Sequence, residues 1–304
     1  MTSAAPPTVP IVAAEMRPSR RGLVPPGRLA LRRFLRNPGA AVGAIVLLIV
    51  ILAVVFGPMI SPFDPDVGKI LESRKPPSAE HWLGTDAIGR DQLARVMAGG
   101  RVSLTIGFIA ALLAVSFGTI VGTLSGWFSG VADAIISRII DILLSVPAVL
   151  VIIVFAGILG PSVPMLIIVF ASLLWPQSAR IARGVVLSLR EQEFVQAARV
   201  LGSRTLFIVF RHLIPGVLPA VIVAATILVA DAVLSEAAVS FLGAGVQPPQ
   251  ASWGNMLNDA KSITVLSSMP WLWLPPGIAI FATVLSTMAV GDGVRDAIDT
   301  RRIG

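Results

Sequence analysis

The stretch 191–219, EQEFVQAARVLGSRTLFIVFRHLIPGVLP, interrupts a chain that is otherwise apolar enough for a lipid bilayer. Two apolar stripes in it recur at the i, i+3, i+4, i+7 spacing of a helix face: Phe194, Ala197, Ala198 and Leu201, then Leu206, Val209, Phe210 and Leu213. Gly202 between the stripes is a natural helix stop, and Pro215 is expected to end the second helix. The stretch therefore predicts two amphipathic helices hinged at a glycine, neither of which is long or apolar enough to span a bilayer.

The rest of the chain has the composition of a membrane protein. Of its 304 residues 55% are hydrophobic and only 13% are charged, whereas a soluble domain carries about 25% charged residues. Six apolar stretches have about the length that a bilayer demands: 40–60, 102–126, 137–159, 163–180, 216–241 and 271–291. Pro147 breaks the third of them and is expected to kink it. The fold class is thus an all-α polytopic membrane protein with about six transmembrane helices.

Several function classes find no support in the sequence. The chain has no cysteine, and its two histidines, His81 and His212, lie far apart and outside any metal-binding pattern, so no metal site is predicted. The net charge of +7 is spread between apolar blocks, which does not suggest a nucleic-acid partner. Residues 84–91 have the glycine spacing of a phosphate loop but lack the Lys and Ser/Thr that must follow, so no nucleotide site is expected in this chain. No catalytic set of nucleophile, base or metal is found, which argues against a membrane-embedded enzyme.

The distribution of Lys and Arg predicts the orientation in the membrane. Most of them lie in the N-terminal tail, the 127–138 turn, the 180–215 segment and the C-terminus, although 61–101 carries some as well. By the positive-inside rule, both termini and the 191–215 segment are cytoplasmic. The predicted organisation is a cytoplasmic tail with a basic amphipathic helix (1–36), a first span and extracytoplasmic loop (37–101), a core containing the 190–215 segment (102–291) and a cytoplasmic tail (292–304).

Three glycines in the second apolar stretch, Gly118, Gly122 and Gly126, recur at steps of four. Small residues at this spacing let another helix approach closely. The alternative is the ordinary tolerance of membrane helices for glycine.

Ionisable residues inside apolar stretches are costly and point to function or to a local pair. Asp141 has Arg138 at i−3, which allows a structural pair. Asp231 and Glu236 lie deep in the fifth stretch, where they either line a polar pathway through the membrane or make interhelical hydrogen bonds. A kink at Pro147 either shapes the pathway or serves packing.

The polar faces of the 191–215 helices admit two interpretations. These faces carry Glu191, Glu193, Gln196, Arg199, Arg204 and Arg211. The helices either flank the bilayer as interfacial elements or insert their polar face into a partner at the membrane surface. Composition alone does not choose between the two.

The sequence resembles the bacterial ABC importer permeases. In VQAARVLGSRTLFIVFRHLIP, the residues Gln196-Ala197-Ala198, Gly202 and His212-Leu213-Ile214-Pro215 match the register of their EAA loop without a gap. Gln196 stands where the family has glutamate, and His212 and Ile214 also depart from the usual residues. The blocks 81–104, 141–150 and 234–257 resemble the C-type subunit of dipeptide, oligopeptide and nickel permeases, so the likeness covers nearly the whole chain.

This resemblance implies a function and a set of partners. The chain would be the transmembrane subunit of an ATP-driven importer of short peptides, with nickel or haem as alternative cargo. It would pair with a homologous permease subunit, two ABC ATPases and an extracytoplasmic substrate-binding protein in the bacterial plasma membrane. ATP and Mg²⁺ would bind the ATPases, leaving no cofactor in this chain. The coupling residues would be Glu191, Glu193, Phe194, Gln196, Ala197, Ala198, Arg199, Gly202, His212, Leu213, Ile214 and Pro215.

A rival from another class is a proton-coupled secondary transporter, in which Asp141, Asp231 and Glu236 relay protons. Such carriers often contain inverted repeats, and no internal repeat is found here.

Overall fold

The computed structural model describes residues 26–298, and this part of the chain is helical, without a strand longer than the single bridge between Thr85 and Asp91. The long helices are α2 (Pro38–Ile60), α3 (Gln92–Phe128), α6 (Val163–Leu189), α9 (Ile214–Leu242) and α12 (Pro270–Ile298). The shorter ones are α1 (Pro26–Arg36), η1 (Ile70–Glu72), α4 (Gly130–Ser145), α5 (Ala148–Leu159), α7 (Glu193–Val200), α8 (Thr205–Ile208), η2 (Val209–Leu213), α10 (Trp253–Met256), η3 (Leu257–Lys261) and α11 (Ile263–Ser268).

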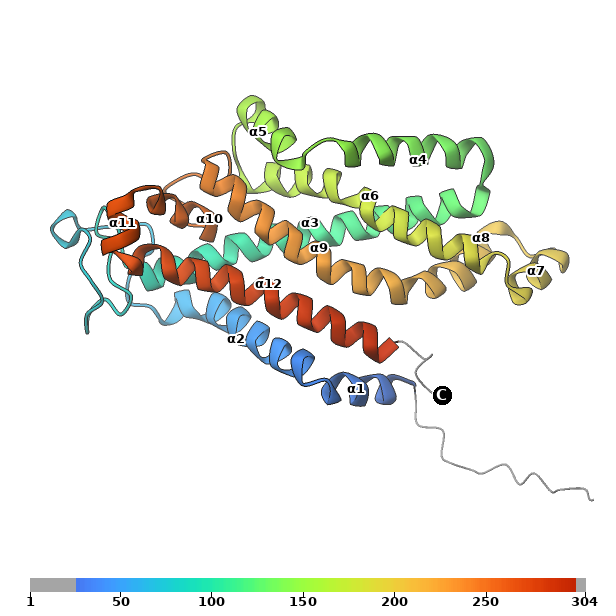
Figure 1. Cartoon of the computed structure of the whole chain (residues 1–304), viewed down its shortest axis with the longest axis horizontal. Helices are drawn as coiled ribbons and strands as arrows, with labels where there is room; N and C mark the ends of the chain where they lie inside the picture. The colour runs from blue at the N-terminus through green and yellow to red at the C-terminus, as the bar shows by residue number, and fades with distance from the viewer. Residues whose placement is uncertain (1–25, 299–304) are drawn as a thin grey trace, which may run out of the picture.

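The long helices run side by side along the molecule, and the connecting segments gather at its two ends (Figure 1). At one end, called here the α7 end, lie α1, the α3–α4 turn, α7 and α8. At the opposite end, called the loop end, lie the loop between α2 and α3 and the short helices α10 and α11. Within residues 26–298, the segments predicted to be cytoplasmic therefore share one end, which is the arrangement that the positive-inside rule requires.

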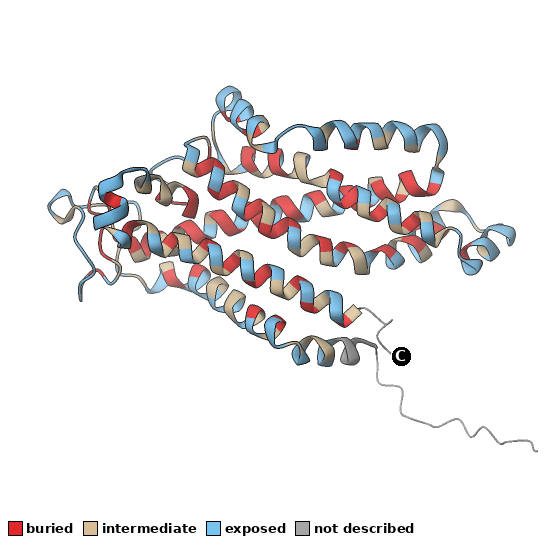
Figure 2. Cartoon of the chain, in the orientation of Figure 1, coloured by how far each residue is buried: buried red, intermediate tan, exposed pale blue. Residues whose placement is uncertain are grey.

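The buried residues concentrate where α3, α6 and α9 meet, whereas α4, α5 and α7 expose most of their surface (Figure 2). At the centre of the bundle, Ile106, Ile152 and Leu166 are completely buried. Exposed leucine, isoleucine and phenylalanine side chains cover the outside of the long helices, as expected where the solvent is lipid.

Helices α3 and α6 approach each other along the glycine stripe. A Cβ atom added to Gly122 would lie 2.8 Å from the Cα of Ala179, and one added to Gly126 would lie 3.0 Å from the carbonyl oxygen of Arg183. One on Gly118 would lie 3.0 Å from the amide nitrogen of Ala179. The prediction that these glycines admit a neighbouring helix is confirmed.

Within residues 26–298, five helices are long and apolar enough to cross a membrane, and α4 and α5 form a sixth span if the pair is counted as one. The two are bent by 82° at Pro147. A proline disfavours helical backbone at the residue before it, and Val146 is accordingly extended, with φ −91° and ψ 128°. The predicted kink is thus a complete break.

Several helices extend beyond the predicted spans. Helix α3 begins at Gln92, where Asp91 caps it by accepting the Ala94 amide at 2.8 Å, and α12 continues to Ile298. Both helices therefore extend past the boundaries expected at 101/102 and 291/292. A helix rises about 1.5 Å per residue, so the 37 residues of α3 exceed the bilayer core and carry polar turns that hydropathy does not detect. The basic amphipathic helix predicted within 1–36 is α1, while 1–25 and 299–304 lie outside the described residues.

Candidate functional site

The predicted hinge of the 191–215 segment is a helix stop at Gly202. Its φ of +77° lies in the left-handed region that favours glycine. The Ser203 amide donates to the Ala198 carbonyl at 3.0 Å, and the Gly202 amide donates to the Arg199 carbonyl at 3.0 Å. These two bonds form a Schellman motif, which satisfies the last carbonyls of α7.

The second helix of the segment does not end at Pro215, as the sequence had suggested. It begins as α8, passes through the π turn η2 and continues into α9, so that Thr205–Leu242 forms one helix of 38 residues. The Ile214 amide reaches back to the Val209 carbonyl. A π turn widens the helix just where a proline ring would otherwise collide with the preceding turn. The segment is therefore joined to a membrane span.

The face of α7 that packs on the protein differs from the predicted stripe. Val195 is completely buried, in a cluster with Trp127, Ile208, Val209 and Leu213, and Ala198 packs against it. Of the predicted stripe, Ala198 packs inward, whereas Phe194 and Leu201 are 49% and 84% exposed, so α7 carries apolar residues on two sides. The exposed apolar side chains of the segment are Phe194, Val200, Leu201, Leu206, Phe207 and Phe210.

Arginines fasten this segment to the corner between α3 and α4. The Arg199 guanidinium lies 4.0 Å from the centre of the Trp127 ring. Arg190 donates to the Gly126 carbonyl at 3.1 Å and to the Ser129 hydroxyl. Arg199 thus ties α7 to α3, and Arg190, at the end of α6, ties the start of the segment to the corner between α3 and α4. Trp127 and Arg190 were not predicted, because Trp127 is far from α7 in the sequence and the contacts of Arg190 with the α3–α4 corner form only in the tertiary fold.

A second clamp joins α6 to the same corner. Arg183 on α6 donates two hydrogen bonds, of 2.6 and 2.7 Å, to the carboxylate of Asp133 on α4. Ser125 near the end of α3 donates to the same carboxylate at 2.5 Å. Three helices thus meet at one acidic side chain.

The remaining predicted coupling residues lie on or beside the exposed surface of the α7 end. Glu193 and Gln196 are exposed, and the Gln196 amide donates to the Glu191 carbonyl at 3.2 Å. The Glu191 carboxylate lies 3.1 Å from Arg190. The His212 ring stands 5.8 Å from both Phe194 and Phe207, centre to centre, and so links α7 to the helix that follows.

The pairing predicted for Asp141 is wrong. Its carboxylate lies 2.7 Å from Arg180 on α6 instead of pairing with Arg138, and both members of the pair are more than half exposed. Arg138, three residues away on the same helix, and Arg180, on the neighbouring α6, could both pair with Asp141, and the pair forms with Arg180. Asp231, on α9, is partly buried.

Glu236 makes the interhelical hydrogen bonds that were one of its two predicted roles. It is completely buried, and its carboxylate accepts from Ser103 on α3 and from Ser240 on α9, both at 2.7 Å. Each hydroxyl also accepts a backbone amide, from Trp253 and Val246 respectively, both at 3.1 Å. One carboxylate thus joins α3, α9 and the start of α10.

Replacing Glu236 with alanine should lower stability sharply, because it leaves two buried hydroxyl donors without an acceptor. At about 1–3 kcal/mol for each unsatisfied group, we expect a loss of about 2–6 kcal/mol, measured as a lower melting temperature in detergent. Asp231→Ala, a control on the same helix, should have a small effect, because Asp231 has no hydrogen bond or ion pair within the described chain. Unchanged melting with lost transport would instead make Glu236 a pathway residue.

Comparison with known proteins accounts for most of the chain. Residues 118–304 match the family model described as binding-protein-dependent transport system inner membrane component. Residues 25–77 match the N-terminal TM domain of oligopeptide transport permease C.

Two relatives illustrate the likeness. A dipeptide transport system permease protein from Alkalihalophilus pseudofirmus is 40% identical over 91% of this chain and 91% of its own length. An oligopeptide transport system permease protein from Bacillus subtilis is 40% identical over 90% of this chain and 88% of its own. The chain therefore belongs to the family of binding-protein-dependent transport system inner membrane components, the permease subunits of ABC transporters.

Proposed function

We propose that this chain is a membrane-spanning subunit of an ATP-driven importer of short peptides, and that the 191–215 segment receives the ATPase. The observation that carries the proposal is the exposed apolar surface of α7 and α8. In Figure 1, α7 forms the tip of the molecule, beyond the ends of α4 and α6. An interfacial helix would cover its apolar residues with lipid. Val200 and Leu201, however, lie at the C-terminal end of α7, the helix that forms this tip, and are 88% and 84% exposed. A protein partner is the natural cover for such a patch.

The contacts of α7 suggest how the motion of the ATPases reaches the spans. Two ABC ATPases would bind ATP and Mg²⁺, close on each other and carry the docked α7 helices with them. The stacking of Arg199 on Trp127 and the Arg190 bonds to Gly126 and Ser129 would transmit that movement to α3 and α4. The continuous helix from Thr205 to Leu242 would transmit it to α9. The spans would then open alternately to the two sides.

The partners and the location follow from the family. A homologous permease subunit would complete the pathway, and an extracytoplasmic binding protein would deliver the substrate. The α7 end would face the cytoplasm of a bacterium and the loop end its exterior. Both similar proteins described above carry peptide names, which favours short peptides over nickel chelates or haem.

The experiment that tests this proposal is transport by the complete complex. Membrane vesicles containing this chain, its partner permease, both ATPases and the binding protein should accumulate a labelled dipeptide or oligopeptide only when ATP reaches the ATPases. Uptake of a nickel chelate or haem in place of peptides would overturn the substrate class. Uptake by this chain alone, driven by a proton gradient, would overturn the mechanism. Within the described chain no hydrogen bond or ion pair joins Asp141 to Asp231 or Glu236, as a direct relay would require.

A further inference from the structure

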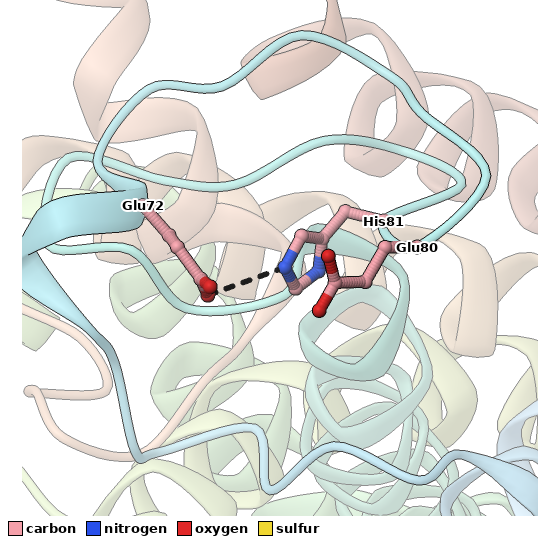
Figure 3. Close-up of side chains that lie close together, drawn as sticks. All are labelled: Glu72, Glu80 and His81. Carbon is pink, nitrogen blue, oxygen red and sulfur yellow. Dashed lines mark ion pairs between the residues drawn. The ribbon is translucent and has the colours of Figure 1, made fainter.

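Three potential metal ligands converge in the loop between α2 and α3. They are Glu72, Glu80 and His81 (Figure 3), and one ligand atom from each lies within 4.8 Å of the others. Glu72 ends the short helix η1, and the other two residues are neighbours in the same loop. This cluster lies at the loop end, remote from the coupling segment.

The orphaned nitrogen of His81 points to a missing ligand. The residue is only 2% exposed, yet its Nε2 atom has no hydrogen-bond partner. In Figure 3 this ring nitrogen faces the Glu72 carboxylate, 3.4 Å away. That separation exceeds the 2.7–3.2 Å of ordinary N–H···O bonds, and a buried polar atom without a partner needs an explanation.

The other ring nitrogen is held in the way that metal-binding histidines are held. His81 Nδ1 lies 2.8 Å from Asp91 Oδ2 in a buried contact. The second oxygen of Asp91 accepts the Ala94 amide at 2.8 Å, which fixes the carboxylate at the start of α3. A carboxylate acceptor keeps the proton on Nδ1, so the lone pair is on Nε2, the nitrogen that faces Glu72. Phe63 packs on the ring, with centres 4.6 Å apart, and fixes its orientation.

The charges around the cluster also favour a cation. Glu72, Glu80 and Asp91 bring three carboxylates to one imidazole. Lys69 and Lys75 reach only the far oxygen of Glu72, at 3.7 and 3.9 Å, and their side chains are 69% and 48% exposed. The lysines thus pair with the Glu72 oxygen that does not face His81, and the Glu80 side chain is exposed.

We propose that Glu72, Glu80 and His81 bind a divalent transition-metal ion, for which Zn²⁺ is the best match. Zn²⁺ accepts imidazole nitrogen together with carboxylate oxygen, whereas Ca²⁺ and Mg²⁺ prefer oxygen alone. Three protein ligands leave one position for water. The ion joins η1 to the 80–81 turn, and through Asp91 to the first turn of α3, and so stiffens the loop end. This inference does not depend on the proposed transport function.

Zinc titration of the purified full-length protein tests the site directly. After removal of metal with a chelator, isothermal titration with Zn²⁺ should show one site. Glu72→Gln and Glu80→Gln should each weaken binding about tenfold or more. Asp64→Asn changes an exposed carboxylate of the same loop and should leave binding unchanged. The absence of binding below about 100 μM Zn²⁺, or equal binding by both Gln variants and wild type, would overturn the proposal.

Asp91→Asn separates a metal ligand set from a merely structural histidine. The asparagine oxygen can still cap α3, but its amide group would face His81 Nδ1 and move the ring proton to Nε2. The variant should bind Zn²⁺ about 10- to 100-fold more weakly, while its melting temperature without metal stays near that of wild type. Wild-type affinity in this variant would contradict the assigned tautomer and therefore the site.

Discussion

Leu201→Asp is expected to abolish ATP-driven uptake while the protein still folds and inserts. Leu201 is 84% exposed, so the substitution removes no contact within the chain and should leave the melting temperature unchanged. In the proposed complex, however, the side chain is buried against the ATPase, where a carboxylate would be desolvated without a partner. Truncating a central residue of an interface costs about 2–4 kcal/mol, which corresponds to roughly 30- to 1000-fold weaker ATPase binding. The measurement is ATPase co-purification together with peptide uptake.

Val67→Asp is the matched control, because Val67 is 67% exposed but lies in the loop between α2 and α3 at the opposite end. It should retain the ATPases. If Leu201→Asp co-purified them as well as wild type does, the 191–215 segment would not be their docking surface. Equal losses in both variants would indicate a general effect of surface polarity instead.

Hydropathy located the spans because each apolar stretch must cross the same thickness of lipid. It did not find their ends, because the extra turns of α3 and α12 are polar or mixed and are held by caps and neighbouring helices. The first turn of α3 carries its own signal in Asp91, a preferred N-cap residue, which hydropathy does not read. The break at Pro147 was predictable because it is a local steric effect.

The 191–215 segment shows why helical periodicity cannot tell an inward face from an outward face. Residues Val195 and Ala198 face the protein, and Phe194 and Leu201 face outward, yet all four are apolar or small. Which side packs inward is set by Trp127 and the other buried residues of the cluster, which come from distant parts of the chain. The stop at Gly202 was predictable, since a left-handed C-cap is a local requirement.

The cluster of Glu72, Glu80 and His81 could not be predicted from sequence motifs. His81 belongs to no recognised metal spacing, and no metal site was predicted from it. Its candidate partners come from an irregular loop and from the N-cap of α3, so their proximity depends on how the 61–91 loop folds. The choice of partner for Asp141 failed for the same reason, because Arg180 reaches it from another helix.

Gly122→Ala should destabilise the protein more than any exposed substitution, although it adds a single methyl group. That carbon would lie 2.8 Å from both the Cα and the carbonyl carbon of Ala179, on the α6 backbone. A flexible side chain could move aside, but a helix backbone moves only by separating α3 from α6. Overpacking costs typically 1–3 kcal/mol and sometimes more, so we expect a loss of about 3 kcal/mol. Thermal melting in detergent should fall by about 5–10 °C.

The control lies on the partner helix of the same crossing. A Cβ atom added to Gly184 on α6 would meet nothing within 4 Å, so Gly184→Ala should be neutral or stabilise the helix by about 0.5–1 kcal/mol. Opposite responses to the same change on two packed helices would show that close backbone approach, and not glycine flexibility, is what α3 requires at residue 122. If Gly122→Ala melted like wild type, α3 and α6 would not be in backbone contact there. The contacts that join α6 and α7 to the corner of α3 and α4 would then rest on a weakly packed pair of helices.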